Sequence, residues 1–480
     1  MKAELKLTTL TPEVIAKVSG GELRVFGKGA DGPVTCVGHD SREACPGMLF
    51  FAIVGERLDG HVFIKNALEA GARVIMCERV PEDVCEGYDF CAIVVDNTVY
   101  GMGALASYYR SLLDGVKVIA ITGSVGKTTT KEMISAVASA SFRTHKTRGN
   151  YNNEIGLPLT LFLLEPDVEV IVLEMGMSNL GEIEHMSNIA KPDICVITNI
   201  GSSHMESLGS RENISRAKLE IASGLAPDGK IIMNGDEPLL FKHKDEFGDR
   251  ALWFGFTNRD NSFRAMNVRL TESDIVFDMV YGDYAVTNVE VPALGKHNVN
   301  NALVAYAVGT VLGMSEEKIR EGLGNFVGEH NRQNIYPVGD ITVIDDCYNA
   351  SPESMRAAID VLTSVAAARG AVPTALLGDM LELGETSALL HDQIGRYAAG
   401  AKVAKLYCYG AMADIIAEAA IKNGIRAENV YVCKNSEAPD DMAELISGAA
   451  KPGDVLLVKA SRGVRAELVI EALKKRFNEN

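Results

Sequence analysis

Short apolar runs alternate with helical patterns along most of the chain. Residues 116–121, 168–173 and 194–198 are apolar stretches rich in β-branched residues, as expected of strands buried on both faces of a parallel sheet. Between residues 265 and 291 apolar and polar positions alternate instead, around a turn signal at Gly282-Asp283, which predicts antiparallel hairpins. The pattern therefore predicts an α/β fold with mostly parallel sheets and one antiparallel extension.

The distribution of these elements predicts three units. Residues 1–97 form a small α/β unit, and residues 98–325 form a central unit with a parallel sheet plus the antiparallel hairpins. In residues 326–480 strands and helices alternate again, which predicts a Rossmann-like parallel sheet with helices on both faces. A chain of 480 residues is long enough for each unit to bury its own core.

A predicted phosphate loop joins the strand at residues 116–121 to the next helical pattern. Its residues are Gly123, Ser124, Val125, Gly126, Lys127, Thr128 and Thr129. Glycines allow a tight turn whose backbone N–H groups face a phosphate, a lysine at this position reaches the β- and γ-phosphates, and the following threonine ligates Mg²⁺. Ile121 stands where the usual pattern has a further glycine, so the loop is a shorter form, and an ordinary Gly-rich turn is the alternative.

Polar side chains follow other predicted strands of the central unit. Glu174 ends the run at residues 168–173, and ligands of parallel sheets bind beyond the carboxyl ends of strands, so Glu174 is a candidate Mg²⁺ ligand. A helix-capping carboxylate is the alternative. His204 follows the run at residues 194–198, and Lys218 lies in a helical pattern, where a lysine is ordinarily a surface charge. Asn153 belongs to an Asn-rich loop whose amides bind phosphate or sugar groups, or cap a helix.

Composition narrows the classes of partner. The net charge of −17 disfavours nucleic acid, because binding to a phosphate backbone needs a basic surface. Nine cysteines, an odd number without a CxxC pair, favour reduced thiols over a disulfide framework or a zinc site. The first ten residues lack a signal-peptide core, and no uncharged apolar run approaches the ~20 residues of a membrane span. These features predict a cytoplasmic protein without a membrane span.

Taken together, these residues resemble the Mur ligase family of ATP-dependent amide-forming enzymes over nearly the whole chain. The resemblance is carried by the phosphate loop and by residues 150–160, Glu174-Met175-Gly176, residues 199–204, Lys218, residues 295–305, Arg332 and residues 345–349. Residues 40–63, 173–177, 345–355 and 377–385 look most like family members that join D-alanyl-D-alanine to UDP-N-acetylmuramoyl-tripeptide. Two positions depart from the family pattern: Asn331 stands where many relatives carry Gly, and Cys347 stands where Ser is common.

The resemblance implies a role for each group of polar residues. The first domain binds the UDP end of the substrate, the second binds ATP with two Mg²⁺ ions, and the third closes over the nucleotide and brings the dipeptide. The implied catalytic residues are Lys127, Lys218, His204 and Arg332. The implied metal ligands are Thr128, Glu174, His204 and Lys218, with Lys218 as an N-carbamate. The implied nucleotide contacts are the phosphate loop, Asn298, Arg332 and Asp346, and the substrate contacts are Ser41, Arg42, Asn153, Asn349 and Ser461.

The implied reaction has two steps. The terminal carboxylate of the tripeptide attacks the γ-phosphate of ATP, giving an acyl phosphate and ADP, and the dipeptide amine then displaces phosphate. The product, UDP-N-acetylmuramoyl-pentapeptide, serves peptidoglycan synthesis and hence cell wall biogenesis, cell shape, the cell cycle and cell division, and the resemblance implies a monomer.

Two other readings remain open from the sequence. Folylpolyglutamate synthetase, or a Mur ligase that adds a single amino acid, shares the same layout. A P-loop switch GTPase is a different class, but residues 257–260 lack the Lys and the spacing of the guanine-binding NKxD signature. The sequence also leaves open whether the tripeptide carries lysine or diaminopimelate.

Overall fold

The computed structural model describes residues 2–30, 32–271, 273–434 and 438–478. Three sheets form the framework of a three-domain, mixed α/β architecture, which confirms the predicted fold class. When residues are grouped by their contacts with one another, the chain divides into two compact units. Unit 1 comprises residues 1–122, 142–196 and 219–231, and unit 2 comprises residues 123–141, 197–218 and 232–480. None of the described helices is both long and apolar enough to cross a bilayer.

The N-terminal sheet belongs to unit 1 and has the strand order β1-β3-β4-β5-β6-β2. The strands are β1 (Lys2–Glu4), β2 (Glu22–Phe26), β3 (Cys36–Gly38), β4 (Met48–Phe51), β5 (Val74–Cys77) and β6 (Phe90–Val94). The four central strands are parallel, and β1 and β2 pair antiparallel at the two edges. The helices are α1 (Pro12–Ser19), η1 (Ser41–Glu43), η2 (Gly60–Phe63), α2 (Ile64–Glu69), η3 (Glu82–Val84) and α3 (Thr98–Arg110). All four residues of β4 are buried, as its unbroken apolar run predicts.

The remaining strands of unit 1 follow the order β10-β7-β9-β8. They are β7 (Lys117–Thr122), β8 (Thr144–Lys146), β9 (Val170–Glu174) and β10 (Ile194–Ile197), with helices α5 (Gly156–Phe162) and α6 (Glu182–Ala190) and the short η4 (Glu220–Ala222). β7 and β8 both run parallel to β9. Glu174 is the last residue of β9, where the sequence places it, and every residue of that strand is buried.

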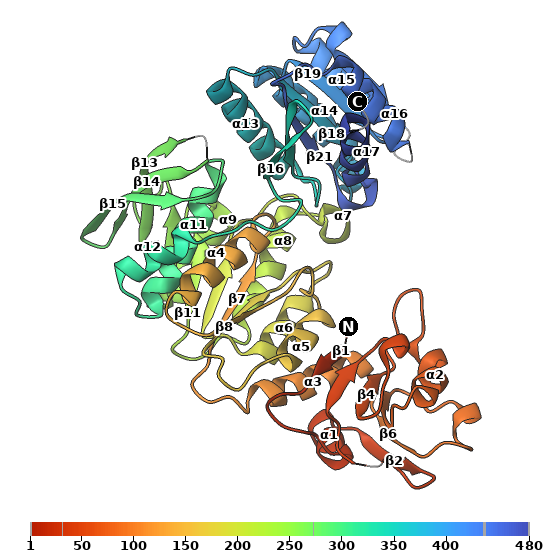
Figure 1. Cartoon of the computed structure of the whole chain (residues 1–480). Coiled ribbons are helices and arrows are strands. Elements are labelled where there is room, and N and C mark those ends of the chain that lie inside the picture. The colour runs from red at the N-terminus through yellow and green to blue at the C-terminus, as the bar shows by residue number, and fades with distance from the viewer. Residues whose placement is uncertain (1, 31, 272, 435–437, 479–480) are drawn as a thin grey trace. The chain divides into compact units, whose positions relative to one another are not determined.

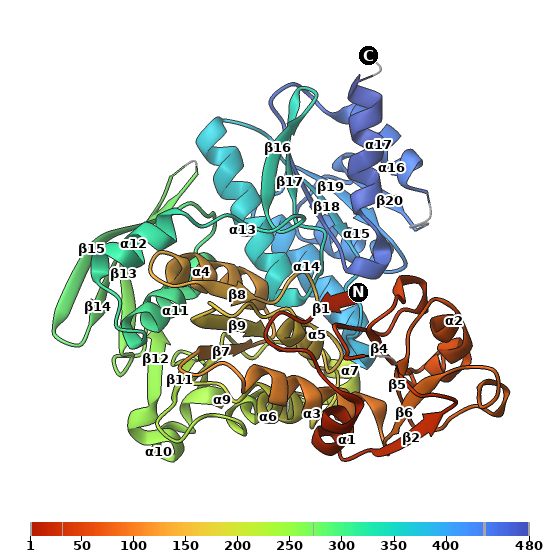
Figure 2. The ribbon, with the colours of Figure 1, turned by 60° about the horizontal axis from the view of Figure 1, so that its bottom comes forward.

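The first part of unit 2 holds the phosphate loop, helices and the hairpins. The helices are α4 (Lys127–Ser139), α7 (Met205–Leu208), α8 (Arg211–Leu219), α9 (Pro238–Phe241), α10 (Lys244–Phe247), η5 (Gly248–Arg250), α11 (His297–Val311) and α12 (Glu316–Gly324). The strands follow the order β15-β14-β13-β12-β11: β11 (Lys230–Asn234), β12 (Ala251–Gly255), β13 (Phe263–Leu270), β14 (Ile275–Tyr281) and β15 (Tyr284–Val291). β13 to β15 are the predicted antiparallel hairpins, and they lie beside α11 and α12 in Figure 2.

The C-terminal sheet of unit 2 has the order β16-β17-β21-β18-β19-β20. Its strands are β16 (Asn334–Val338), β17 (Ile341–Asp345), β18 (Pro373–Gly378), β19 (Lys405–Tyr409), β20 (Val430–Cys433) and β21 (Val455–Lys459). Five strands are parallel and β16 is antiparallel to β17. Its helices are α13 (Pro352–Arg369), η6 (Gly384–Thr386), α14 (Ser387–Gly400), α15 (Ala413–Lys422), η7 (Ala427–Asn429), α16 (Pro439–Ala449), η8 (Arg462–Val464) and α17 (Glu467–Asn478).

Two separate apolar clusters cover the faces of this C-terminal sheet. One gathers residues of α13, α14 and α15, and the other gathers residues of α16 and α17 (Figure 1). The prediction of helices on both faces is therefore confirmed. The sequence pattern missed the β20–α16 pair, because β20 has only four residues and none of them is fully buried. The helical pattern after the phosphate loop is α4, which begins at Lys127, so the polar residues of the loop form its first turn.

Candidate active site

The phosphate loop begins at the residue that follows β7 and depends on two glycines. Gly123 has φ +149° and Gly126 has φ +84°, backbone conformations that favour glycine. A Cβ added at Gly123 would lie 1.8 Å from Thr198 Oγ1, and one added at Gly126 would lie 3.0 Å from Asn301 Oδ1. The loop therefore packs too closely against its neighbours to accept a side chain at Gly123.

The segment that follows β10 supports this loop through hydrogen bonds. Asn199 Oδ1 accepts from the backbone N–H groups of Ser124 (3.1 Å) and Val125 (2.9 Å). Thr198 Oγ1 donates to Val125 O over 2.7 Å. The sequence predicted that the loop N–H groups converge on one centre, but two of them point at Asn199. Anion binding therefore falls to the N-terminus of the 13-residue α4, whose first N–H groups have no partner within the helix.

Two lysines lie together at this loop. Lys127 Nζ donates to Gly123 O over 2.8 Å, and Thr128, the second residue of α4, is buried behind it. Lys218 on α8 is only 1% exposed. Burial, together with repulsion from Lys127, lowers the pKa of Lys218 well below its ordinary value. The lowered pKa makes the neutral amine, the nucleophilic form of the side chain, more accessible in Lys218 than in an exposed lysine.

Glu174, in unit 1, is a buried carboxylate with one oxygen unengaged. Glu174, the last residue of β9, is 2% exposed, and its Oε1 accepts from Asn152 Nδ2 over 2.8 Å. Its Oε2 is buried without a hydrogen-bond partner among the described residues. Because a buried anionic oxygen is costly unless a donor or cation meets it, this oxygen fits a metal ion. Within the described ranges, no three His, Cys, Asp or Glu side chains already converge on one point.

His204 is held by a carboxylate that the sequence did not indicate. The residue adopts a left-handed conformation (φ +64°) and caps α7. Its Nδ1 lies 2.8 Å from Glu382 Oε2, and this hydrogen bond lowers the pKa of Glu382. Nearby, Glu353 Oε1 accepts from Ser202 N (3.1 Å) and from Ser202 Oγ (2.9 Å). Both glutamates lie far from residues 202–204 in sequence, so no local pattern could have revealed these contacts.

Two adjacent aspartates at the end of β17 have different environments. Asp345 is buried and accepts from Tyr336 Oη (3.0 Å) and Cys347 Sγ (2.9 Å). Asp346 instead lies 2.7 Å from the ammonium of Lys459. The interior position of Asp345 makes it a structural residue, which leaves Asp346 as the member of the pair that is available to a ligand.

Arg332 precedes β16 and packs on an aromatic ring. Its guanidinium carbon lies 4.1 Å from the centroid of Tyr348, a cation–π distance. Its Nε is buried with no hydrogen-bond partner in the described part of the chain. A guanidinium whose Nε is buried and unengaged fits a phosphate or a carboxylate.

Asn298 forms part of a buried amide chain that links α4 to α11. Asn301 Nδ2 donates to Asn298 Oδ1 over 2.7 Å, and Asn301 Oδ1 accepts from Thr130 Oγ1 over 3.0 Å. Asn298 Nδ2 donates in turn to Leu294 O over 2.8 Å. The contact of Asn298 with a nucleotide base stays a prediction, but the structure gives this residue a second task in holding the two helices.

The predicted substrate residues differ in exposure. The Arg42 side chain is 87% exposed and pairs with Asp40 over 2.6 Å beside Ser41, the first residue of η1. Asn153 Oδ1 accepts from Gly156 N over 2.8 Å at the start of α5, so the capping alternative is observed. Ser461 is buried, and its Oγ accepts from Leu381 N (3.0 Å) and donates to Ala350 O (3.3 Å). The backbone oxygen of Asn349 accepts from Lys459 over 3.0 Å. Direct substrate contacts of these residues stay predictions.

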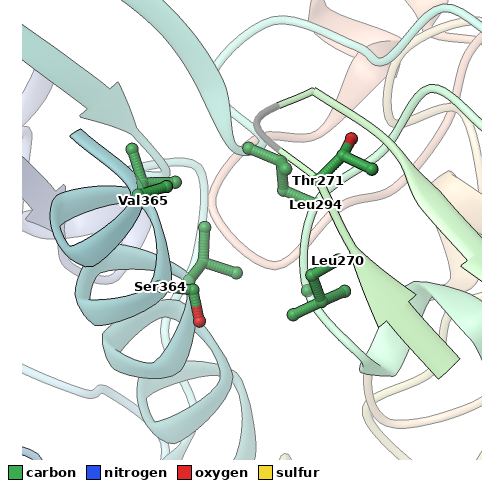
Figure 3. A pocket seen from close by; sticks show the side chains of 8 residues that line it. Leu270, Thr271, Leu294, Ser364 and Val365 are labelled. Atoms are coloured by element: carbon green, nitrogen blue, oxygen red, sulfur yellow. The ribbon is translucent and has the colours of Figure 1, made fainter.

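A pocket of about 230 Å³ in unit 2 has an uncharged lining (Figure 3). Leu270, Thr271 and Leu294 face Ser364 and Val365 of α13 across it. None of its lining side chains is ionisable, so the pocket does not suit a triphosphate.

Family models match three parts of the chain. They are "Mur ligase family, catalytic domain" at residues 33–108, "Mur ligase middle domain" at residues 121–309 and "Mur ligase, glutamate ligase domain" at residues 331–462. Together these matches span well over half of the sequence. The middle-domain match contains the phosphate loop, Glu174, His204 and Lys218, and the third match contains Arg332 and Asp346.

Individual proteins resemble the chain over nearly its full length. UDP-N-acetylmuramoyl-tripeptide–D-alanyl-D-alanine ligase of Bacillus subtilis (strain 168) is 39% identical over 442 residues, which cover 91% of this chain and 92% of the relative. A crystal structure of MurF from Acinetobacter baumannii has a TM-score of 0.88 at 30% identity and covers 98% of this chain and 100% of its own. MurF ligase from Thermotoga maritima in complex with ADP has a TM-score of 0.80 at 28% identity, covering 92% and 98%.

Proposed function

The chain belongs to the Mur ligase family, and from that premise we propose that it joins D-alanyl-D-alanine to the terminal carboxylate of UDP-N-acetylmuramoyl-tripeptide with hydrolysis of ATP to ADP. The observation that carries the proposal is the match to the Bacillus subtilis ligase of that name across 91% of the chain. The phosphate loop with Lys127 and the Arg332 guanidinium support it, since an ATP-dependent ligase needs both a triphosphate site and local positive charge.

The chemistry requires charge neutralisation more than covalent catalysis. The substrate carboxylate attacks the γ-phosphorus, the bond to the β-phosphate oxygen breaks, and ADP leaves. The dipeptide amine then attacks the acyl carbon, loses a proton, and expels inorganic phosphate. A carboxylate that approaches a triphosphate is repelled, so Lys127 and Arg332 act by placing cations beside the reacting oxygens.

Mg²⁺ is the proposed cofactor, with two ions bound. Thr128, Glu174, His204 and Lys218 would hold them, and the unengaged, buried Oε2 of Glu174 supports this assignment. When bound, Mg²⁺ screens the negative charge of the phosphates. His204 keeps one imidazole nitrogen for this role while Nδ1 contacts Glu382.

Lys218 is the proposed site of N-carbamylation. A neutral lysine amine attacks CO₂, forming a carbamate and releasing one proton, and the lowered pKa of Lys218 makes the neutral form more accessible than in an exposed lysine. Carbamylation turns the lysine amine beside Lys127 into an anion with two oxygens. Lys127 then faces an opposite charge, and the carbamate supplies a metal ligand.

The remaining assignments follow the family resemblance. Ser41 and Arg42 bind the UDP end of the substrate, Asn153 is a further substrate contact, and Asn349 and Ser461 serve the dipeptide. Asn298 and Asp346 contact the base and ribose of ATP. The enzyme is a cytoplasmic monomer of domains 1–97, 98–325 and 326–480, and its product serves cell wall biogenesis, cell shape, the cell cycle and cell division.

A substrate-dependence assay tests the proposal. Purified protein is given ATP or GTP, UDP-N-acetylmuramoyl-tripeptide with lysine or diaminopimelate, and one of three acceptors: D-alanyl-D-alanine, L-glutamate or D-glutamate. We expect amide product only with ATP and the dipeptide. Product with L-glutamate when a folate replaces the UDP-tripeptide would indicate a folylpolyglutamate synthetase, and GTP hydrolysis without any ligation would indicate a switch GTPase.

A further inference from the structure

Lys459, the last residue of β21, is a buried cation with three acceptors around it. Its side chain is 2% exposed. Nζ lies 2.7 Å from Asp346 Oδ2, 3.0 Å from Asn349 O and 3.3 Å from Asp346 O. An ammonium group has three N–H donors, so the acceptors match its full capacity.

This arrangement is costly to disturb. A buried charge is tolerated only where partners replace its hydration, and removal of one partner leaves the other as an uncompensated charge. Asp346 is itself mostly buried, with a side-chain exposure of 13%. The three contacts therefore hold Lys459 and the segment at residues 346–349 as one rigid unit.

The segment held by Lys459 also supports Arg332. Lys459 contacts the first and the last residue of the segment, and Tyr348 lies between them. The Tyr348 ring lies 4.1 Å from the Arg332 guanidinium carbon, and Tyr348 N donates to Asn331 O over 3.2 Å. Movement of the segment would thus move both Asp346 and the surface on which Arg332 packs.

We propose that Lys459 is a positioning residue for the nucleoside triphosphate: it holds the Asp346 side chain in place directly, and it holds the Arg332 guanidinium in place through Tyr348. The inference rests on the proposed function, because that function gives Asp346 and Arg332 their roles at ATP. Lys459 does not itself contact the nucleotide, since all of its donors are engaged within the protein.

The same sheet provides a matched control. Lys405 is the first residue of β19, and its Nζ contacts Ala449 O (2.6 Å) and Asp454 Oδ2 (3.2 Å), with 16% of the side chain exposed. It makes the same kind of lysine–aspartate–carbonyl cluster. β19 and β21 both run parallel to β18, so Lys405 lies at the amino ends of these strands and Lys459 lies at their carboxyl ends. Ligands of α/β sheets bind at the carboxyl ends, so Lys405 lies away from the ligand side.

The experiment compares Lys459→Met with Lys405→Met in the full chain. The measurements are kcat, KM for ATP, KM for the UDP-tripeptide, ADP binding by calorimetry, and thermal melting. For Lys459→Met we expect kcat to fall about 100-fold, as a small misplacement of catalytic groups produces. In Lys459→Met, KM for the UDP-tripeptide should stay within about threefold of the wild-type value. Lys405→Met should lose about as much melting temperature as Lys459→Met, yet its kcat should stay within about threefold of wild type.

A double variant, Lys459→Met with Asp346→Asn, tests the route of the effect. If Lys459 acts through Asp346, the double variant is within about threefold of the worse single variant. Losses of kcat that multiply in the double variant, or equal losses of kcat in Lys459→Met and Lys405→Met, would overturn the inference.

Should Lys459→Met fail to fold, Tyr348→Leu replaces it. That change leaves the lysine cluster intact and should lower kcat about tenfold by removing the cation–π contact; an unchanged kcat would contradict the proposed path.

Two controls separate this inference from the proposed function. If the wild-type protein does not ligate the two substrates, the proposed function fails, and ADP binding still tests Lys459. A tenfold weaker affinity for ADP in Lys459→Met than in Lys405→Met, about 1.4 kcal/mol, supports the inference, and equal affinities overturn it.

Discussion

The phosphate loop and the loop with Ser41 and Arg42 are both predicted to contact a nucleotide, yet they are built differently. None of residues 123–129 of the phosphate loop is exposed, and the loop is held by Thr198 and Asn199 and restricted to glycine at Gly123 by a close approach. The other loop is a single 3-10 turn whose Arg42 side chain is 87% exposed and contacts only its neighbour Asp40 among the described residues. The difference indicates that the first site is preorganised for chemistry, whereas the second can adjust to a ligand and contributes recognition.

The largest expected effect comes from Lys127→Ala. Loss of the ammonium removes a charge beside the reacting phosphate, and we expect kcat to fall about 1,000-fold. The loop backbone remains, so the melting temperature and the affinity for the UDP-tripeptide should change little. Activity and thermal melting are measured together. Near-normal turnover in a folded variant would show that Lys127 of the phosphate loop does not take part in catalysis.

Gly123→Ala tests whether the loop depends on its backbone shape. The new Cβ would meet Thr198 Oγ1 at 1.8 Å, so the loop must shift, and we expect kcat to fall about 100-fold. Gly149→Ala is the matched control: Gly149 also has a positive φ (+52°), but nothing lies within 4 Å of its added Cβ. It should cost about 1–3 kcal/mol of unfolding free energy through backbone strain while kcat is kept. If both variants lose kcat equally, close packing of the loop is not the cause.

Lys218→Ala tests the proposed carbamate. We expect kcat to fall roughly 10- to 100-fold, as loss of groups that arrange a metal site does. Short-chain carboxylic acids such as acetate and propionate should restore part of the rate, because their oxygens can occupy the place of the carbamate. Rate is measured against carboxylate concentration, with Lys230→Ala as the control. A fully active Lys218 variant, or one that no carboxylate rescues, would leave the carbamate without support.

Arg42→Ala should have the smallest effect. We expect KM for the UDP-tripeptide to rise about tenfold through one lost charged contact, with kcat unchanged.

The Arg42–Asp40 pair also predicts a pH dependence of stability. The hydrogen bond from Arg42 holds the pKa of Asp40 below its usual range, so the pair stabilises the fold only while Asp40 is ionised. The stability difference between wild type and the variant should be small near neutral pH, because solvent screens an exposed pair. It should shrink as the pH falls below about 4, where the carboxylate of the unfolded chain takes up a proton. A loss of kcat equal to that of Lys127→Ala would erase the distinction between the two loops.

The same contrast explains what the sequence could predict. The strand run ending in Glu174, the phosphate loop and the hairpins around Gly282-Asp283 are local patterns, and the structure confirms each as an element. Lys218 was interpreted as a candidate only through the family resemblance, since a helical lysine is ordinarily exposed and its burial depends on distant packing. Contacts such as His204 with Glu382 and Lys459 with Asp346 join residues more than 100 positions apart, and pairing over that distance leaves no periodic signal. The β20–α16 pair was missed because a four-residue, half-buried strand resembles a loop.

We expect ATP to react only when the substrate carboxylate is in place. Phosphoryl transfer needs the nucleophile, the phosphate and the charged side chains aligned at once, and the carboxylate is itself the nucleophile. Phosphate release is measured with ATP alone, with ATP and the UDP-tripeptide, and with both of these and D-alanyl-D-alanine. We expect negligible release with ATP alone, little sustained release with the UDP-tripeptide added, and steady turnover only in the complete mixture. Rapid release with ATP alone, or equal rates in all three mixtures, would show that ATP reacts without the carboxylate nucleophile.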